Sequence, residues 1–536
     1  MLYVIHSVCL LLSRWDVAVL CPGHELAPTT IMSKKRNPVC LKELIQHEIC
    51  TMINRPFVTW IYKLYSSEEL GWRQRLPVFQ LVLKQCVELK EYLMSLPESA
   101  CKLLMEKIFK TVSAIIASYH LALCSRLGAL ACRLQYEEVC LYMLRVVFLP
   151  CIKECNIRDI QNVFVQELVS QSLHTNPNIT RLILPHIPTT KVVRSVFSSF
   201  ESLAVLQEFS FEFSCTADIV IELGKHCKLL KVLDITGSKL VNDECVQYLL
   251  NMRNLEKLYV SETKISETCY AVLISSLPRI QNITWLGPVE CILKNIRKKR
   301  LPKVNEFLGV ISDVPLVRKL CPHIKKLSVC LQTKKSLDLI HLTEIVSLEF
   351  TSSDYYIHNL RIIIECMGIR LTKLDFAAVR NVDITHIISC CPVLKILNLA
   401  LCEIVISENF TFAPELQHFK SVQEITFVRN SGFEYFLKFL HLYVNLELFH
   451  AEGVREIQDM CVSAILKAGG FRKLSKILLG FCGLLTLQTA MMLIENCDNL
   501  CLIGKLDTWS GVNGNDRIIL LDFVRTNNLA HALVLK

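Results

Sequence analysis

One apolar pattern occurs twice in succession between Lys228 and Glu267 and constrains the fold more than any other stretch. The first copy is Leu230-x-x-Leu233-x-Ile235-x-x-Ser238-x-Leu240, and the second is Leu255-x-x-Leu258-x-Val260-x-x-Thr263-x-Ile265. In each copy, the alternation of apolar and polar residues predicts a short strand with one buried face. Two copies alone do not define a repeat protein, so the extent of the pattern decides the fold class.

The same pattern continues on both sides of this pair. Successive copies stand 20 to 28 residues apart, which is too regular a spacing for chance. The apolar pairs of the strands are Leu182/Leu184, Phe209/Phe211, Leu233/Ile235, Leu258/Val260, Ile283/Trp285, Leu327/Val329, Leu348/Phe350, Leu374/Phe376, Leu397/Leu399, Ile425/Phe427, Phe449/Ala451 and Ile477/Leu479, with weaker copies at Phe307 and Ile503. This period matches the leucine-rich repeat, in which each repeat buries its apolar face against its neighbours.

Helix-like segments separate the strands, as at Asn242–Leu250, Glu267–Leu277, Ile384–Cys390 and Leu487–Asn496. Stacked strand–turn–helix units predict an α/β fold, a horseshoe-shaped leucine-rich-repeat solenoid with a parallel sheet on the concave side and helices on the convex side. The side chains between the inward apolar pairs point the other way. The residues that we therefore expect to line the concave surface and to bind a partner are Asp234, Tyr259, Thr284, Ser328, Glu349, Asp375, Asn398, Thr426 and His450.

The pattern predicts four segments along the chain. Residues 1–31 are interpreted as a non-native or disordered extension, because Met32-Ser-Lys-Lys-Arg resembles an ordinary polar N-terminus, which leaves Met1 and Met32 open as starts. Residues 32–170 have apolar residues at helical spacing and predict an all-α region, with its first helix ending before Arg55-Pro56. Residues 171–510 hold the repeats, and residues 511–536 form a C-terminal cap.

Composition favours an intracellular protein without bound metal. The 26 cysteines include no C-x-x-C pair, so we expect small buried side chains rather than zinc ligands or a disulfide framework. Glycosylation sequons at Asn178 and Asn282 fall on predicted strands, where a glycan would obstruct the sheet. The net charge of +9 is scattered, so it permits a nucleic-acid partner but does not argue for one, and none is expected. No apolar run is long enough to span a membrane, and the expected location is cytoplasmic or nuclear.

A family resemblance enters at the repeats that carry cysteine. These are His226-Cys227-x-x-Leu230-x-x-Leu233-x-Ile235, followed by Val241-Asn242-Asp243-Glu244-Cys245, and Cys391-Pro392-x-Leu394-x-x-Leu397-x-Leu399-x-x-Cys402-x-Ile404. Partial matches begin at Cys321-Pro322 and Leu474. The sequence of roughly residues 171–510 resembles the F-box leucine-rich-repeat family. The resemblance implies that the repeats recognise a protein substrate, while an N-terminal box binds an adaptor of a cullin-type ubiquitin ligase.

Two N-terminal sequence segments are candidates for such a box. Leu96-Pro97 with Ile108-Phe109 is similar to an F-box, which binds a Skp1-like adaptor, but one extra helical turn displaces the pairs by about 5 Å. Leu41-x-x-Leu44-Ile45-x-x-x-Ile49 is similar to the Elongin-binding box of other cullin-ligase receptors, with Ile45 at the usual cysteine position. The alternative at both places is an ordinary amphipathic helix in a helical domain.

No sequence motif for catalysis or cofactor binding appears, because the chain lacks a phosphate-binding loop, a nucleophile elbow and a paired-histidine metal motif. We therefore expect no enzyme activity and no cofactor. The leading hypothesis is a protein-interaction module, as the substrate receptor of a ubiquitin ligase. The alternatives are a scaffold or regulator without a ligase link, and a secreted recognition protein.

Overall fold

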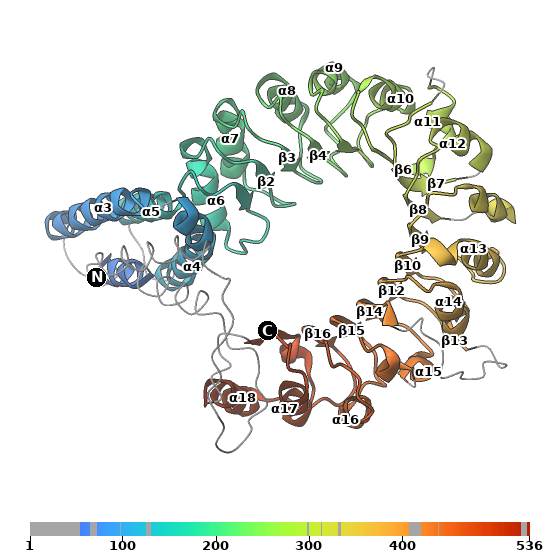
Figure 1. Cartoon of the computed structure of the whole chain (residues 1–536). Coiled ribbons are helices and arrows are strands. Elements are labelled where there is room, and N and C mark those ends of the chain that lie inside the picture. Colours follow the sequence, from blue (N-terminus) through green and yellow to red (C-terminus); the bar gives the residue numbers. More distant parts are fainter. Residues whose placement is uncertain are drawn as a thin grey trace, which may run out of the picture. The chain divides into compact units, whose positions relative to one another are not determined.

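The computed structural model describes residues 54–64, 72–96, 98–124, 130–296, 300–311, 313–330, 334–406, 420–437, 439–526 and 533–535. The described residues divide into two compact units, one that ends at Ile280 and one that begins at Gln281. Figure 1 shows the elements of each unit, and each is described by itself.

The first unit begins with helices, as predicted. Residues 54–64 are helical and include Arg55 and Pro56, where the sequence predicted a break. Three longer helices follow, which are α3 (Trp72–Met94), α4 (Glu98–Cys124) and α5 (Leu130–Val147). Helix α5 packs against both α3 and α4, and the fully buried Ile108, Ile116 and Met143 lie in this core.

A parallel five-stranded sheet completes the first unit. Its strands, in spatial and sequence order, are β1 (Glu154–Asn156), β2 (Arg181–Ile183), β3 (Glu208–Ser210), β4 (Val232–Asp234) and β5 (Lys257–Tyr259). Its helices are α6 (Val163–Ser172), α7 (Thr190–Ser199), α8 (Ala217–His226), α9 (Val246–Asn251) and α10 (Glu267–Ser276). Strand β1 lies before residue 171, where we expected the repeats to begin. Cys155 of this strand and Ile157, directly after it, are buried like the apolar pairs of the later strands.

The second unit contains a parallel sheet of eleven strands. These are β6 (Asn282–Pro288), β7 (Glu306–Val310), β8 (Lys326–Cys330), β9 (Ser347–Thr351), β10 (Lys373–Ala377), β12 (Ile396–Ala400), β14 (Glu424–Val428), β15 (Leu448–Glu452), β16 (Lys476–Gly480), β17 (Leu502–Gly504) and β18 (Val534–Leu535). The short strands β11 (Val382–Asp383) and β13 (Ile404–Val405) pair separately. The helices are α11 (Glu290–Leu293), α12 (Val314–Leu320), α13 (Leu360–Met367), α14 (Ile384–Cys390), α15 (Phe433–Leu437), α16 (Asp459–Lys467), α17 (Leu487–Asn496) and α18 (Gly514–Thr526).

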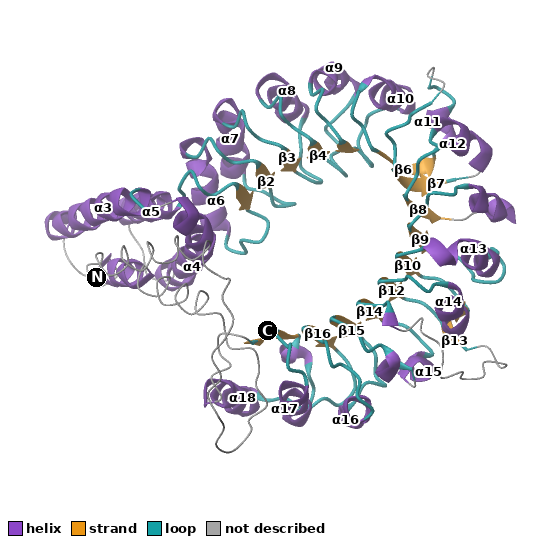
Figure 2. Cartoon of the chain, in the orientation of Figure 1, coloured by secondary structure: helices purple, strands orange, loops and turns teal. Residues whose placement is uncertain are grey.

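The predicted leucine-rich-repeat class is confirmed. In each unit the strands line one side and the helices the other (Figure 2). Strands β9, β10, β12 and β15 alternate buried and half-exposed residues, with the predicted apolar pairs buried. The weaker copies at Phe307 and Ile503 are strands β7 and β17. No helix in the described ranges is long and apolar enough to cross a membrane.

The turn after each strand explains the polar position of the repeat pattern. In the second unit, the residue directly after a strand adopts a left-handed backbone conformation, at Ser352, Ala378, Leu401, Arg429, Gly453, Phe481 and Lys505. Such a tight turn leaves buried backbone groups without a partner in the sheet. Side chains of the next repeat supply it. Asn430 Oδ1 accepts from Cys402 N at 2.7 Å, and Asn430 Nδ2 donates to Leu399 O at 2.8 Å.

Ser238 and Cys402 likewise contact a backbone oxygen of the repeat that precedes their own. Ser238 Oγ donates to Phe211 O at 3.3 Å, and Cys402 Sγ lies 3.4 Å from Phe376 O. We call these residues, together with Asn430 and Cys482, the turn ladder. They occupy the Asn/Cys position of the pattern, so a small polar side chain is needed there to satisfy the turn of the preceding repeat.

Candidate protein-binding face

The predicted concave residues of the second unit stand side by side across the sheet. Strand pairing places them in one register, each at the middle of its strand. We call this set the central row, and it consists of Ser328, Glu349, Asp375, Asn398, Thr426 and His450. Every member is half-exposed. The structure therefore brings together six side chains, of which the first and the last, Ser328 and His450, are more than 120 residues apart in the sequence.

The centre of this row is held by polar contacts. Lys373 Nζ, on the same strand as Asp375, lies 2.7 Å from Asp375 Oδ2. Asn398 Nδ2 of the next strand donates to Asp375 Oδ1. These contacts orient the Asp375 carboxylate, whose side chain remains 17 % exposed. Lys373 belongs to the first position of the strand and was not predicted, because the sequence alone does not show which flanking side chain turns toward the row.

His450 ends the central row beside a second ionic group. Its Nε2 lies 3.6 Å from Glu452 Oε2, and Lys505 Nζ lies 3.6 Å from the same oxygen. Burial lowers the pKa of His450, and the Glu452 carboxylate opposes that effect. The imidazole is therefore predominantly neutral near pH 7, where it can donate one hydrogen bond and accept another.

Asp234 and Tyr259 occupy the equivalent register of the first unit and are half-exposed. Asp234 Oδ1 accepts from Thr236 N at 3.1 Å. Burial raises the pKa of Asp234, with smaller opposing effects from its hydrogen bonds with Thr236. The carboxylate lies beside a polar cluster that the sequence analysis missed.

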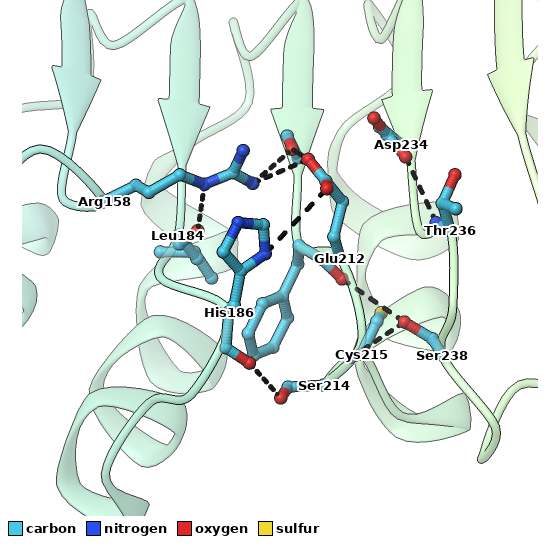
Figure 3. A network of polar contacts seen from close by, with 11 residues as sticks. Arg158, Leu184, His186, Glu212, Ser214, Cys215, Asp234, Thr236 and Ser238 are labelled. Atoms are coloured by element: carbon cyan, nitrogen blue, oxygen red, sulfur yellow. Dashed lines mark hydrogen bonds and ion pairs between the residues drawn. The ribbon is translucent and has the colours of Figure 1, made fainter. Parts of the chain in front are cut away.

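That cluster joins Arg158, His186 and Glu212, which follow β1, β2 and β3 (Figure 3). Arg158 Nη2 lies 2.8 Å from Glu212 Oε1 and 3.1 Å from Ser210 Oγ, and Arg158 Nε donates to Leu184 O at 3.3 Å. His186 Nδ1 lies 3.8 Å from Glu212 Oε2. No spacing in the sequence links residues 158 and 212, because only the stacking of the repeats brings them together.

Thr284 corrects one sequence prediction. It was expected on the accessible surface, yet only 4 % of it is exposed, and Asn282 Nδ2 lies 3.0 Å from its hydroxyl. Its strand β6 is irregular. The register shifts between Thr284 and Pro288, and Trp285, predicted as a buried partner of Ile283, is half-exposed. A register irregularity breaks the two-residue alternation on which the prediction relied.

The structure describes three residues of the N-terminal box candidates. Leu96 is 6 % exposed and Ile108 is fully buried, so both pack in the core of the first unit. Phe109 is half-exposed and contacts Phe148, with ring centroids 5.4 Å apart. Leu41, Leu44, Ile45 and Pro97 lie outside the described residues, as do residues 1–31.

The sequons are distributed differently from the prediction. Asn282 is fully buried in strand β6. Asn178 lies in the turn before β2 rather than on a strand, and its Nδ2 donates to Pro150 O at 3.2 Å. The sequence argument from a glycan on the sheet therefore applies to Asn282 and does not apply to Asn178.

The cysteines pack as small apolar residues. Among those whose surroundings the structure describes, Cys291 and Cys366 are the exposed ones, and all are free thiols. Cys227, Cys321, Cys391 and Cys497 each cap the C-terminal end of a helix in a buried position. Burial raises the pKa of Cys155 to about 12 and that of Cys402 to about 11. In the described part of the chain, no group of three or more His, Cys, Asp or Glu side chains could hold a metal ion.

On the helical side, a cysteine thiol lies beside a histidine imidazole, as in the catalytic pair of cysteine hydrolases. Cys390 Sγ lies 3.5 Å from His386 Nε2, and the Tyr355 hydroxyl lies 2.9 Å from His386 Nδ1. Burial raises the pKa of Cys390 and lowers that of His386. Both shifts favour the neutral pair, whereas a catalytic cysteine needs the thiolate. The contact therefore supports packing of α14 rather than nucleophilic chemistry.

Comparison with known proteins gives similarity of fold only. No family model matches the chain, and no curated protein matches its sequence. Among solved structures, an internalin from Listeria monocytogenes is 14 % identical with a TM-score of 0.34, over 64 % of this chain and 92 % of that one. A leucine-rich-repeat protein from Leptospira interrogans is 16 % identical with a TM-score of 0.30, over 68 % and 91 %. Rad7, solved in complex with Elc1 from yeast, is 14 % identical with a TM-score of 0.37, over 78 % and 95 %.

Proposed function

We propose that this protein is a non-enzymatic protein-interaction module and that the central row of its second unit binds a protein partner. One observation carries the proposal, namely the row of six half-exposed and chemically varied side chains in register on adjacent strands. Adjacent strands are about 4.8 Å apart, so the row extends over roughly 25 Å, the width of an ordinary protein–protein interface.

The rigidity of the sheet supports this role. Each member of the row stands between two buried apolar residues of its own strand, so its backbone is fixed before a partner arrives. Binding then orders only side chains, which lowers the entropic cost of association. Mixed charge, amide, hydroxyl and imidazole groups suit recognition of a specific protein surface rather than a uniformly charged polymer.

A charge reversal in the row tests the proposal. We expect the double substitution Glu349→Lys/Thr426→Arg to reduce partner binding at least tenfold, because it adds two cations and two long side chains to the row. Proximity labelling with the full-length chain in cells, followed by quantitative mass spectrometry, identifies the partners and measures their loss.

The matched control is Glu365→Lys/Ile362→Arg on the exposed side of helix α13, which makes the same change in net charge away from the sheet. It changes charge in the same unit and is expected to retain the labelled set. If both double variants label the same proteins as the wild type, the central row is not the binding surface.

We extend the proposal to a substrate receptor of a cullin-type ubiquitin ligase, on the strength of the cysteine-containing repeats. Burial of Leu96 and Ile108 argues against the F-box-like segment as the adaptor site. We therefore propose that the adaptor binds the segment that contains Leu41, Leu44 and Ile45. Elongin is then the favoured adaptor. A scaffold without a ligase link is the alternative.

Co-purification separates these two functions. We expect the full-length chain to retain an Elongin adaptor and a cullin, and Leu41→Ala/Leu44→Ala to lose at least nine-tenths of both. Leu81→Ala, at a position 45 % exposed on α3, is the control and should retain them. If neither a Skp1-like nor an Elongin adaptor is retained by the wild type, the scaffold function replaces the ligase function, while the test of the central row stands separately.

A further inference from the structure

A groove of about 1050 Å³ lies in the first unit between helix α4 and the start of its sheet. We call it the α4–β1 groove. Its apolar lining includes Phe109, Ala117, Leu121 and Phe164. Phe164 is held in place by stacking on His120, with ring centroids 3.9 Å apart. The volume is at the upper end of the range for small-molecule pockets, which favours a larger ligand such as a peptide.

The free edge of β1 forms one wall of this groove. Strand β1 is the terminal strand of its sheet and, among the described residues, pairs only with β2. Lys153 O and Ile157 N bond to β2, at 3.1 Å from Arg181 N and 2.9 Å from Ile183 O. Because the direction of backbone groups alternates along a strand, the N–H and C=O groups of Glu154 and Asn156 point away from β2. Both residues line the groove.

Two side-chain atoms in the groove lack hydrogen-bond partners. Ser113 Oγ, on α4, and Asn156 Oδ1, on β1, are both buried from solvent and unpaired. Ser113 as a whole is 6 % exposed. A buried polar atom without a partner costs about 1–3 kcal/mol, and native proteins retain few of them. Both residues line the groove.

The charges at the rim favour a basic ligand. Arg181 Nε lies 2.8 Å from Glu208 Oε1 and its Nη1 lies 3.2 Å from Glu154 Oε2, so its charge is balanced within the sheet. Glu106 and Asp159 remain exposed on the rim, and among the described lining residues Lys110 is the exposed cation beside them. A lysine or arginine of the ligand would therefore meet a net negative rim.

We propose that the α4–β1 groove binds an extended peptide segment of a protein partner, which adds as a new strand to the free edge of β1. The peptide backbone pairs with Glu154 and Asn156, its apolar side chains enter the groove, and a basic side chain lies near Glu106 and Asp159. Strand addition of this kind gives affinity through main-chain hydrogen bonds and selectivity through alternate side chains. This site is separate from the central row and does not depend on it.

A peptide selection on the full-length chain tests the proposal. Random 12-residue peptides displayed on phage are selected on the wild-type protein, and the enriched sequences are synthesised and measured by fluorescence anisotropy. We expect peptides with alternating apolar residues and at least one lysine or arginine. Glu154→Pro removes one outward-facing N–H at the first position of the strand, where proline is tolerated, and should weaken binding at least tenfold.

Two comparisons separate this effect from misfolding. Glu154→Ala keeps the N–H and should bind within threefold of the wild type. Ala117→Trp fills the groove from α4 and leaves the residues of β1 unchanged, and it should also weaken binding at least tenfold, whereas Leu81→Trp on α3 should not. Bound peptide should also slow amide hydrogen exchange at residues 154 and 156. Equal binding by wild type and by Ala117→Trp, or no enrichment of any peptide by the wild type, would overturn the proposal.

Discussion

Phe427→Ala is expected to destabilise the second unit by about 3–5 kcal/mol, the usual cost of removing a fully buried phenylalanine. Phe427 is fully buried on strand β14, and its ring centroid lies 4.8 Å from that of Phe433 and 4.5 Å from that of Phe436. The substitution leaves a cavity and removes two edge-to-face contacts. Urea denaturation followed by circular dichroism measures the loss, and hydrogen exchange locates it at β14 and its neighbours.

Phe481→Ala is the matched control for this prediction. Phe481 directly follows strand β16, its side chain is 60 % exposed, and its backbone N–H donates to Thr508 Oγ1 at 3.1 Å, a bond that the substitution keeps. We expect a change within about 0.5 kcal/mol. A comparable loss in both variants would mean that Phe427 does not lie in the core of its repeat.

Asn430→Ala should cost about 2–4 kcal/mol, because it removes two hydrogen bonds to buried backbone groups. Cys402 N loses its acceptor and Leu399 O loses the bond from Asn430 Nδ2, both in the preceding repeat. The local effect should appear as faster amide exchange at Cys402, and the global effect as a lower urea midpoint.

Asn445→Ala supplies the comparison for the turn ladder. Asn445 Nδ2 also donates to a backbone oxygen, that of Lys420 at 2.6 Å, but at an exposed position where water replaces the bond. We expect a loss below about 1 kcal/mol. If the two asparagine variants are equally stable, the turn ladder contributes little to the fold.

The strands could be predicted from sequence because their signal is local. Apolar pairs such as Leu374/Phe376 repeat at one spacing, and burial on one sheet face fixes the alternation. Strand β1 was missed because Glu154–Asn156 is short and follows a long helical region. The predicted alternation of buried and exposed residues in β6 was wrong at Thr284 and Trp285. A register irregularity between two strands leaves no pattern in the sequence of either strand.

The central row could be predicted for the same reason, since two-residue alternation assigns every middle residue of a strand to one face. Its contacts could not. The ion pair between Lys373 and Asp375 depends on side-chain orientation, and that between Arg158 and Glu212 depends on the stacking of separate repeats. Burial of Ile108 likewise follows from how α4 and α5 pack, which helical periodicity alone does not specify.

The buried thiols give the solenoid a set of built-in reporters. Cys155, Cys227, Cys321, Cys402 and Cys497 lie in different repeats, and each is shielded from solvent. A thiol reagent in excess can reach such a side chain only when its repeat opens. The rate at which each cysteine is labelled under native conditions would therefore rank the opening free energies of the repeats, without any introduced cysteine.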